Sequence, residues 1–78
     1  MGAEAKRDYT INRFIRQFID ENDKRPSAIA DRAGIRRDSF SRIINSKRPI
    51  YADELIPIIN AAGISLEQIV EAVEKRAG

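Results

Sequence analysis

The sequence predicts an all-α protein with one compact domain of five helices. Apolar residues recur at helical spacing in several segments, and proline or glycine stands where these segments begin or end. The length of 78 residues suits one small domain. Because the chain has no cysteine and no histidine, neither a disulfide framework nor the usual kind of zinc site can form. We expect packed helices, helped by self-association, to supply the stability, with no metal and no cofactor.

The first predicted helix begins after Thr10, whose hydroxyl is expected to cap it, and ends near Asn22 or Asp23. Its apolar residues form one stripe with helical periodicity: Ile11, Phe14, Ile15, Phe18 and Ile19. Its polar residues are expected to face solvent: Asn12, Arg13, Arg16, Gln17 and Asp20. Residues 1–8 show no periodicity and are expected to form a flexible arm ahead of the folded domain, residues 9–78. Lys6 and Arg7 of this arm could reach a phosphate or a minor groove, or belong to a disordered tail.

The second and third predicted helices are short and are joined by a tight turn. The second begins at Pro26, which suits a first helical position, and ends at Gly34, which is expected to adopt a left-handed conformation. The third runs from Arg36 or Arg37 to Asn45. Its inward face is predicted to hold Phe40, Ile43 and Ile44. Its outer face is predicted to hold Asp38, Ser41, Arg42 and Asn45.

The last two predicted helices follow a loop. The fourth covers about residues 52–62, with Gly63 as its stop, and Pro57 predicts either a start near Asp53 or a kink. Four of its residues are predicted to enter the core: Leu55, Ile56, Ile58 and Ile59. Ser65 and Gln68 form a capping-box pattern for the fifth helix. The predicted core stripe of that helix is Leu66, Ile69, Val70 and Val73, and its predicted outer side is Glu67, Glu71 and Glu74.

Positive charge is concentrated in one part of the chain, although the net charge is only +2. The segment 24–48 holds two acidic residues, Asp31 and Asp38, against eight basic ones: Lys24, Arg25, Arg32, Arg36, Arg37, Arg42, Lys47 and Arg48. This asymmetry favours a surface that faces a polyanion, and the alternative is an ordinary solvated surface. No serine stands beside a plausible base and no glycine-rich phosphate loop is present, so we do not expect an enzyme.

The pattern Ala30, Gly34, Ile35, Phe40 and Ile43 resembles the helix-turn-helix of the lambda-repressor-like, Cro-type (XRE) family of DNA-binding regulators. The resemblance continues through SKRPIYADELIPIINAAGISLEQI and covers roughly residues 10–73. It implies a lambda-repressor-like five-helix fold with the helix-turn-helix at helices 2 and 3. The chain departs from the family at Arg25 and Pro26, where a Ser cap and a phosphate-binding Gln are common. Further departures are Ser46 and Ile50, where Gly and Pro are common.

The resemblance also implies roles for residues of this segment. The third helix would lie in the major groove, with Arg37, Asp38 and Arg42 contacting bases and Arg36 and Ser41 assisting. Asp38 could instead pair with Arg42 and orient it. The DNA backbone would be contacted by the following residues: Arg25, Ser27, Asn45, Ser46, Lys47 and Arg48.

Together these expectations describe a sequence-specific, double-stranded DNA-binding transcription regulator. A phage- or prophage-like repressor that binds a near-palindromic operator as a homodimer is favoured, with the dimer surface around the corner between the fourth and fifth helices and the C-terminus. The alternatives are an antitoxin or other protein-interaction module, and a non-specific DNA binder. No small-molecule ligand is expected. No apolar run approaches the ~20 residues of a membrane span and no signal-peptide pattern opens the chain, so a cytoplasmic, nucleoid-associated protein of bacterial or phage origin is expected.

Overall fold

The computed structural model describes residues 9–77, with the side chains of residues 9–75. This part of the chain holds no strand and forms five helices, which confirms the predicted all-α class: α1 (Thr10–Glu21), α2 (Pro26–Ala33), α3 (Arg37–Ile44), α4 (Ala52–Ala62) and α5 (Leu66–Ala77). The predicted flexible arm of residues 1–8 lies outside the described residues.

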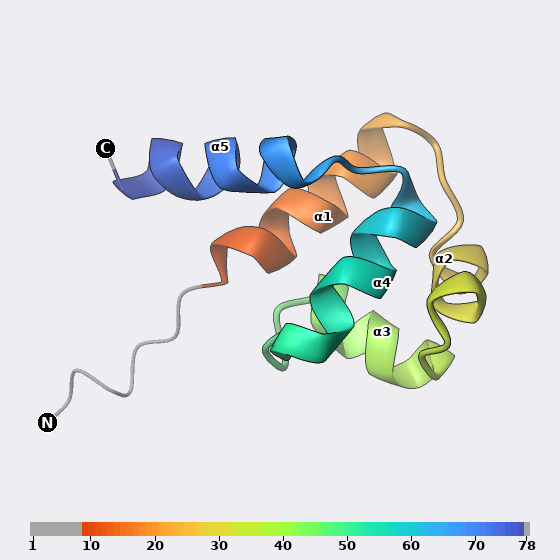
Figure 1. The fold of residues 1–78 in the computed structure, drawn as a ribbon. Helices are drawn as coiled ribbons and strands as arrows, with labels where there is room; N and C mark the ends of the chain where they lie inside the picture. The colour runs from red at the N-terminus through yellow and green to blue at the C-terminus, as the bar shows by residue number, and fades with distance from the viewer. Residues whose placement is uncertain (1–8, 78) are drawn as a thin grey trace, which may run out of the picture.

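The five helices are arranged so that α2 and α3 lie at one side of the molecule and α5 at the other (Figure 1). α1 contacts both α3 and α5, while α2 packs against α3 and α4. α4 therefore packs over α2, and α1 connects α3 with α5. Helix α3 is held from two directions, which leaves one of its faces to solvent.

A single apolar core lies between the helices, and every helix contributes to it. Ile15 and Ile19 enter from α1, and Phe40 and Ile43 enter from α3. The remaining buried members are Ile29, Ala30, Ile44, Ile58, Ile59, Ala62, Ile64 and Ile69. The predicted inward face of α3 is thereby confirmed.

The turn between α2 and α3 is fixed by backbone hydrogen bonds and a glycine. Gly34 has φ 74°, so it adopts the expected left-handed conformation, which a residue with a Cβ atom resists. The Ile35 amide donates to the Ala30 carbonyl at 2.9 Å, and the Gly34 amide donates to the Asp31 carbonyl at 3.2 Å. These bonds satisfy carbonyls that the helix end would otherwise leave open. Ile35 packs against the core, so the direction in which α3 departs is set on both sides of the turn.

Three details of α1 and α4 differ from the predictions: the cap of α1 and the exposure of two side chains, Asn12 and Ile56. Thr10 is the first helical residue of α1, and Tyr9 holds the cap position. Asn12 is buried rather than exposed. Helix α4 covers the predicted residues 52–62, so Pro57 lies inside it, five residues after its start. Ile56 was expected in the core, but it is 47% exposed.

The exposed face of α5 is the largest departure from the sequence prediction. The Ser65–Gln68 capping box is confirmed, with the Gln68 side chain accepting from the Ser65 amide at 2.9 Å and the Ser65 hydroxyl accepting from the Gln68 amide at 3.2 Å. Of the four residues predicted as a core stripe, only Ile69 is buried. The other three, which we call the α5 stripe, are substantially exposed: Leu66 at 54%, Val70 at 45% and Val73 at 41%.

Within the described residues, no helix has the length and apolar character needed to cross a membrane by itself. α4 and α5 satisfy the criteria of length and composition only when they are taken together, and they are bent by 115° at the break between them.

Candidate nucleic-acid interface

Helix α3 carries the residues that were predicted to contact bases, and the structure places all of them on solvent-exposed positions. Phe40, Ile43 and Ile44 anchor the inner face of the helix in the core. The outer positions and the residue before the helix are exposed: Arg36, Arg37, Asp38, Ser41 and Arg42. Since the apolar anchors fix the rotation of the helix about its axis, these five polar side chains share one continuous surface.

Ion pairs organise the arginines of this surface. Arg37 donates from Nε to Asp31 Oδ1 at 3.1 Å and from Nη2 to Asp31 Oδ2 at 2.7 Å, which links α3 to the last turn of α2. The hydrogen bond from Arg37 lowers the pKa of Asp31, and the same bond raises the pKa of Arg37. Asp38 contacts Arg36 at 3.3 Å and Arg42 at 3.8 Å. The Arg42 contact is compatible with either role expected for Asp38, orienting Arg42 or accepting from a base.

Asn45 closes the C-terminal end of α3 and joins it to α1. Its Nδ2 donates to the Ser41 carbonyl at 2.9 Å, while its Oδ1 accepts from Arg16 Nη1 at 2.6 Å. Arg16 also contacts Asp20 at 3.2 Å. Arg16 was not among the predicted contacts, because helical periodicity within α1 places it on the solvent side without showing which residue of the neighbouring helix lies beside it.

The next two residues of the loop begin a turn away from α3. Ser46 has φ 57°, a left-handed conformation that favours glycine. The Lys47 amide donates to the Arg42 carbonyl at 2.8 Å. The Lys47 side chain is exposed and Ser46 is half-buried. Lys47 is thus presented to solvent directly beside the outer face of α3.

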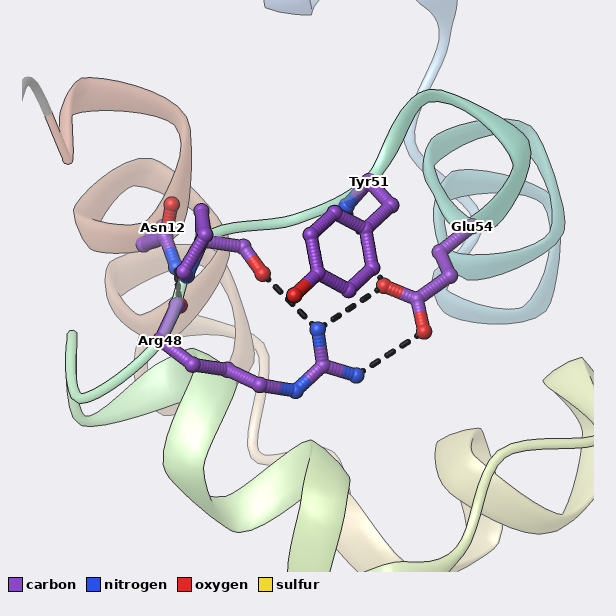
Figure 2. Close-up of polar contacts among 5 residues, drawn as sticks. Asn12, Arg48, Tyr51 and Glu54 are labelled. Carbon is purple, nitrogen blue, oxygen red and sulfur yellow. Dashed lines mark hydrogen bonds and ion pairs between the residues drawn. The ribbon is translucent and has the colours of Figure 1, made fainter.

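Arg48 was expected to contact the DNA backbone, and the structure gives its side chain several partners within the protein (Figure 2). Its Nη1 and Nη2 donate to the two carboxylate oxygens of Glu54 at 3.0 and 2.8 Å, and Nη1 also donates to the Pro49 carbonyl at 2.8 Å. The guanidinium lies 5.1 Å from the centre of the Tyr51 ring. The side chains of Arg48 and Glu54 are only 20% and 22% exposed. This arrangement, the Arg48–Glu54 clasp, ties the loop to the first turn of α4.

The clasp changes the acid–base properties of its members. The hydrogen bond from Arg48 is the main cause that lowers the pKa of Glu54, and the amide of Tyr51, which donates to Glu54 at 3.1 Å, acts in the same direction. The hydrogen bond to Glu54 also raises the pKa of Arg48. Both groups therefore remain charged across the neutral range.

Asn12 of α1 holds the other side of the same loop. Its side chain is almost fully buried, with the residue 4% exposed, and its Nδ2 donates to the Ile43 carbonyl at 2.9 Å and to the Arg48 carbonyl at 3.0 Å. Figure 2 shows Asn12 beside Arg48. These two carbonyls belong to the end of α3 and to the loop after it. A signal for this role was present in the sequence, because Asn12 stands seven residues before the core residue Ile19 and so lies on the same side of the helix.

Arg25 and Ser27, the two remaining predicted backbone contacts, lie at the start of α2. Arg25 is the cap residue and Pro26 is the first helical residue. The side chains of Arg25 and Ser27 are exposed. The first amides of a helix have no partner within the helix, and this end of α2 carries no cap hydrogen bond from the Arg25 side chain.

Other features of the described residues lie apart from this surface. An open groove of about 1000 Å³ runs between α1 and α5 and includes no residue of α2 or α3. Within residues 9–75, no group of three or more acidic side chains is arranged to hold a metal ion.

The chain matches no known protein-family model, and no curated protein and no solved structure shows significant similarity to it.

Proposed function

We propose that this protein is a sequence-specific regulator that binds double-stranded DNA through α3 and acts as a repressor. The observation that carries the proposal is the outer face of α3 together with the residue before the helix, where five polar side chains are exposed above an apolar anchor. A single short helix fits the width of the major groove, and arginine, aspartate and serine match the donors and acceptors of base edges. A helix with a purely structural role would not need this set of side chains.

In this proposal the phosphate contacts come from elements on either side of α3. Lys47 is an exposed cation immediately after the helix, and Ser46 precedes it. Arg25 and the free amides near Ser27 would act at the start of α2. Arg16 and Asn45, which are hydrogen-bonded to each other, extend the polar surface at the end of α3. Arg48 is assigned to holding the loop, because its guanidinium is committed to Glu54 and Pro49.

The proposal includes a homodimer that pairs through the α5 stripe. One α3 contacts only a few base pairs, so a specific site requires two copies related by two-fold symmetry, with recognition helices about 34 Å apart. The α5 stripe consists of three exposed apolar side chains on one side of a helix that is covered on its other side by α1. Burial of the same patch from each copy would remove this apolar area from water.

Selection of bound duplexes from a random library tests the function most directly. The purified protein should enrich one sequence with approximate two-fold symmetry, with half-sites about one helical turn apart. Enrichment of an asymmetric sequence would remove the dimer and keep base recognition. Uniform retention of all duplexes would indicate a non-specific binder. An absence of retained DNA at low salt would exclude the proposal and favour a protein-interaction module.

A further inference from the structure

Asp31 and Arg37 form a two-bonded pair between two helices on the proposed DNA surface. The bonds of 3.1 and 2.7 Å join the Nε–Nη2 edge of the guanidinium to both carboxylate oxygens. Such a pair fixes the plane of the guanidinium as well as its position. Asp38 contacts Arg36 at 3.3 Å and Arg42 at 3.8 Å. Both distances are longer than either bond between Asp31 and Arg37.

The position of Asp31 is not one that helix stability favours. It lies in the last turn of α2, where a carboxylate interacts unfavourably with the helix dipole. The side chains of Asp31 and Arg37 are 54% and 67% exposed, and exposed ion pairs contribute little to stability. The pair is therefore better explained by what it does to Arg37 than by what it does for the fold.

The pair leaves one edge of Arg37 free for a ligand. Nε–H and one Nη2–H are occupied by Asp31. The Nη1–Nη2 edge still presents one N–H from each nitrogen, and these two N–H groups point in the same direction. Two parallel donors on one edge match the O6 and N7 acceptors of guanine in the major groove. Adenine offers a donor in place of O6, so a guanidinium held in this orientation would pair poorly with it.

We propose that Asp31 is a positioning residue that determines specificity, by holding Arg37 so that its free edge selects guanine; this inference rests on the proposed function. Asp31 acts in two ways. It prevents Arg37 from turning toward a phosphate, and it places a negative charge beside the DNA backbone. Both effects weaken binding to sequences that lack the guanine, because phosphate contacts supply most of the non-specific affinity.

The test is a double-mutant cycle with Asp31→Asn and Arg37→Ala. Arg37→Ala first identifies the base pair at which the preference for guanine is lost. Dissociation constants are then measured at one salt concentration for three duplexes: the selected site, the same site with adenine in place of that guanine, and a random sequence. Asp31→Asn should reduce the preference for guanine about tenfold and strengthen binding to the random duplex roughly fivefold. In the Arg37→Ala background, Asp31→Asn should cause no further change in base preference.

Glu21→Gln is the charge-matched control. It removes one negative charge from an exposed residue in the last turn of α1, which lines the groove between α1 and α5 rather than the surface of α3. It should alter all three dissociation constants by a similar small factor and leave the preference for guanine intact. Circular dichroism and thermal unfolding of each variant verify that the fold is retained.

The outcomes separate the two proposals. If the unmodified protein prefers particular bases but Asp31→Asn leaves the preference for guanine unchanged, the inference is wrong and the proposed function stands. An equal loss of preference with and without Arg37 would also overturn it, because Asp31 would then not act through Arg37. If the unmodified protein shows no base preference at all, the proposed function fails, and the inference fails with it.

Discussion

The Asn12 side chain provides a single polar contact point for three parts of the chain. Asn12 belongs to α1, and its side-chain amide donates to one backbone carbonyl in the last turn of α3 and to another in the loop that follows. Both bonds lie in or beside the core, where water cannot replace them easily. A buried amide of this kind is costly to remove, since the carbonyls that it satisfied lose their partner.

We expect Asn12→Ala to lower the free energy of unfolding by about 1–3 kcal/mol. Asn22→Ala is the matched control, because the Asn22 amide also donates to a backbone carbonyl, that of Phe18 at 2.9 Å, but in an exposed position. The control should change the stability by less than about 0.5 kcal/mol. Urea unfolding of both variants measures the difference, and equal losses would show that burial of Asn12 contributes nothing special.

Arg42 and Lys47 are both exposed cations close to the end of α3, and the proposal gives them different tasks. Arg42→Ala should weaken binding to the selected site by about 1–3 kcal/mol and relax the preference at one base pair. Lys47→Ala should weaken binding to all duplexes alike and reduce the slope of log K against log salt by about one. Binding isotherms at several salt concentrations distinguish the two. A loss of equal size on selected and random DNA for Arg42→Ala would contradict its assignment to bases.

At the scale of the elements, the loop between α3 and α4 is stabilised by the Arg48–Glu54 clasp. Because Glu54 has a lowered pKa in the folded state, it binds its proton less readily there than in the unfolded chain. Its contribution to stability is therefore present above the unfolded value of about 4.3 and is lost as the pH falls through the folded value. The clasp should strengthen the fold at neutral pH and fail in acid.

Glu54→Gln should lower the free energy of unfolding by about 1–2 kcal/mol at pH 7, because a charged, partly buried hydrogen bond is replaced by a neutral one. The difference from the unmodified protein should shrink as the pH is lowered below about 4. Denaturant unfolding at a series of pH values measures this. Glu74→Gln, an exposed change on α5, should shift stability by less than about 0.5 kcal/mol. A pH-independent difference for Glu54→Gln would show that shape, not charge, is responsible.

Helical periodicity predicted the elements well and the contacts between them poorly. α2 and α3 were located almost to the residue, because proline, glycine and three clustered apolar side chains mark them. The position of Asn12 on the core side follows from the same periodicity, but its polarity suggested solvent. The pairing of Asp31 with Arg37 crosses a turn over six residues, a separation that no helical spacing rule covers. The clasp likewise depends on the path of a loop.

For α5 the sequence identified the apolar residues but not the side of the helix that neighbours cover. Leu66, Ile69, Val70 and Val73 form one broad stripe on a helical wheel. α1 covers only one margin of that stripe, and Ile69 alone is buried. How much of a stripe is buried depends on the tertiary arrangement, which a single helix cannot specify. The residues left exposed are the ones that the dimer proposal uses.

For the whole molecule, the sharpest prediction concerns assembly. Val70 lies in the middle of the α5 stripe and is 45% exposed, so Val70→Glu should be tolerated by the monomer and should oppose pairing by placing a charge where an apolar contact is proposed. Sedimentation equilibrium should show a homodimer for the unmodified protein and a monomer for Val70→Glu, with unchanged circular dichroism. Since two recognition helices bind one site, the monomer should lose affinity for the selected duplex by more than tenfold, about 1.4 kcal/mol, while its weak binding to a single half-site persists.

Asn60→Asp adds the same charge at an exposed position of α4 and should leave the homodimer intact. A Val70→Glu protein that still sediments as a dimer would place the interface elsewhere, and a monomeric unmodified protein at concentrations that saturate the selected site would confine pairing to the DNA-bound state.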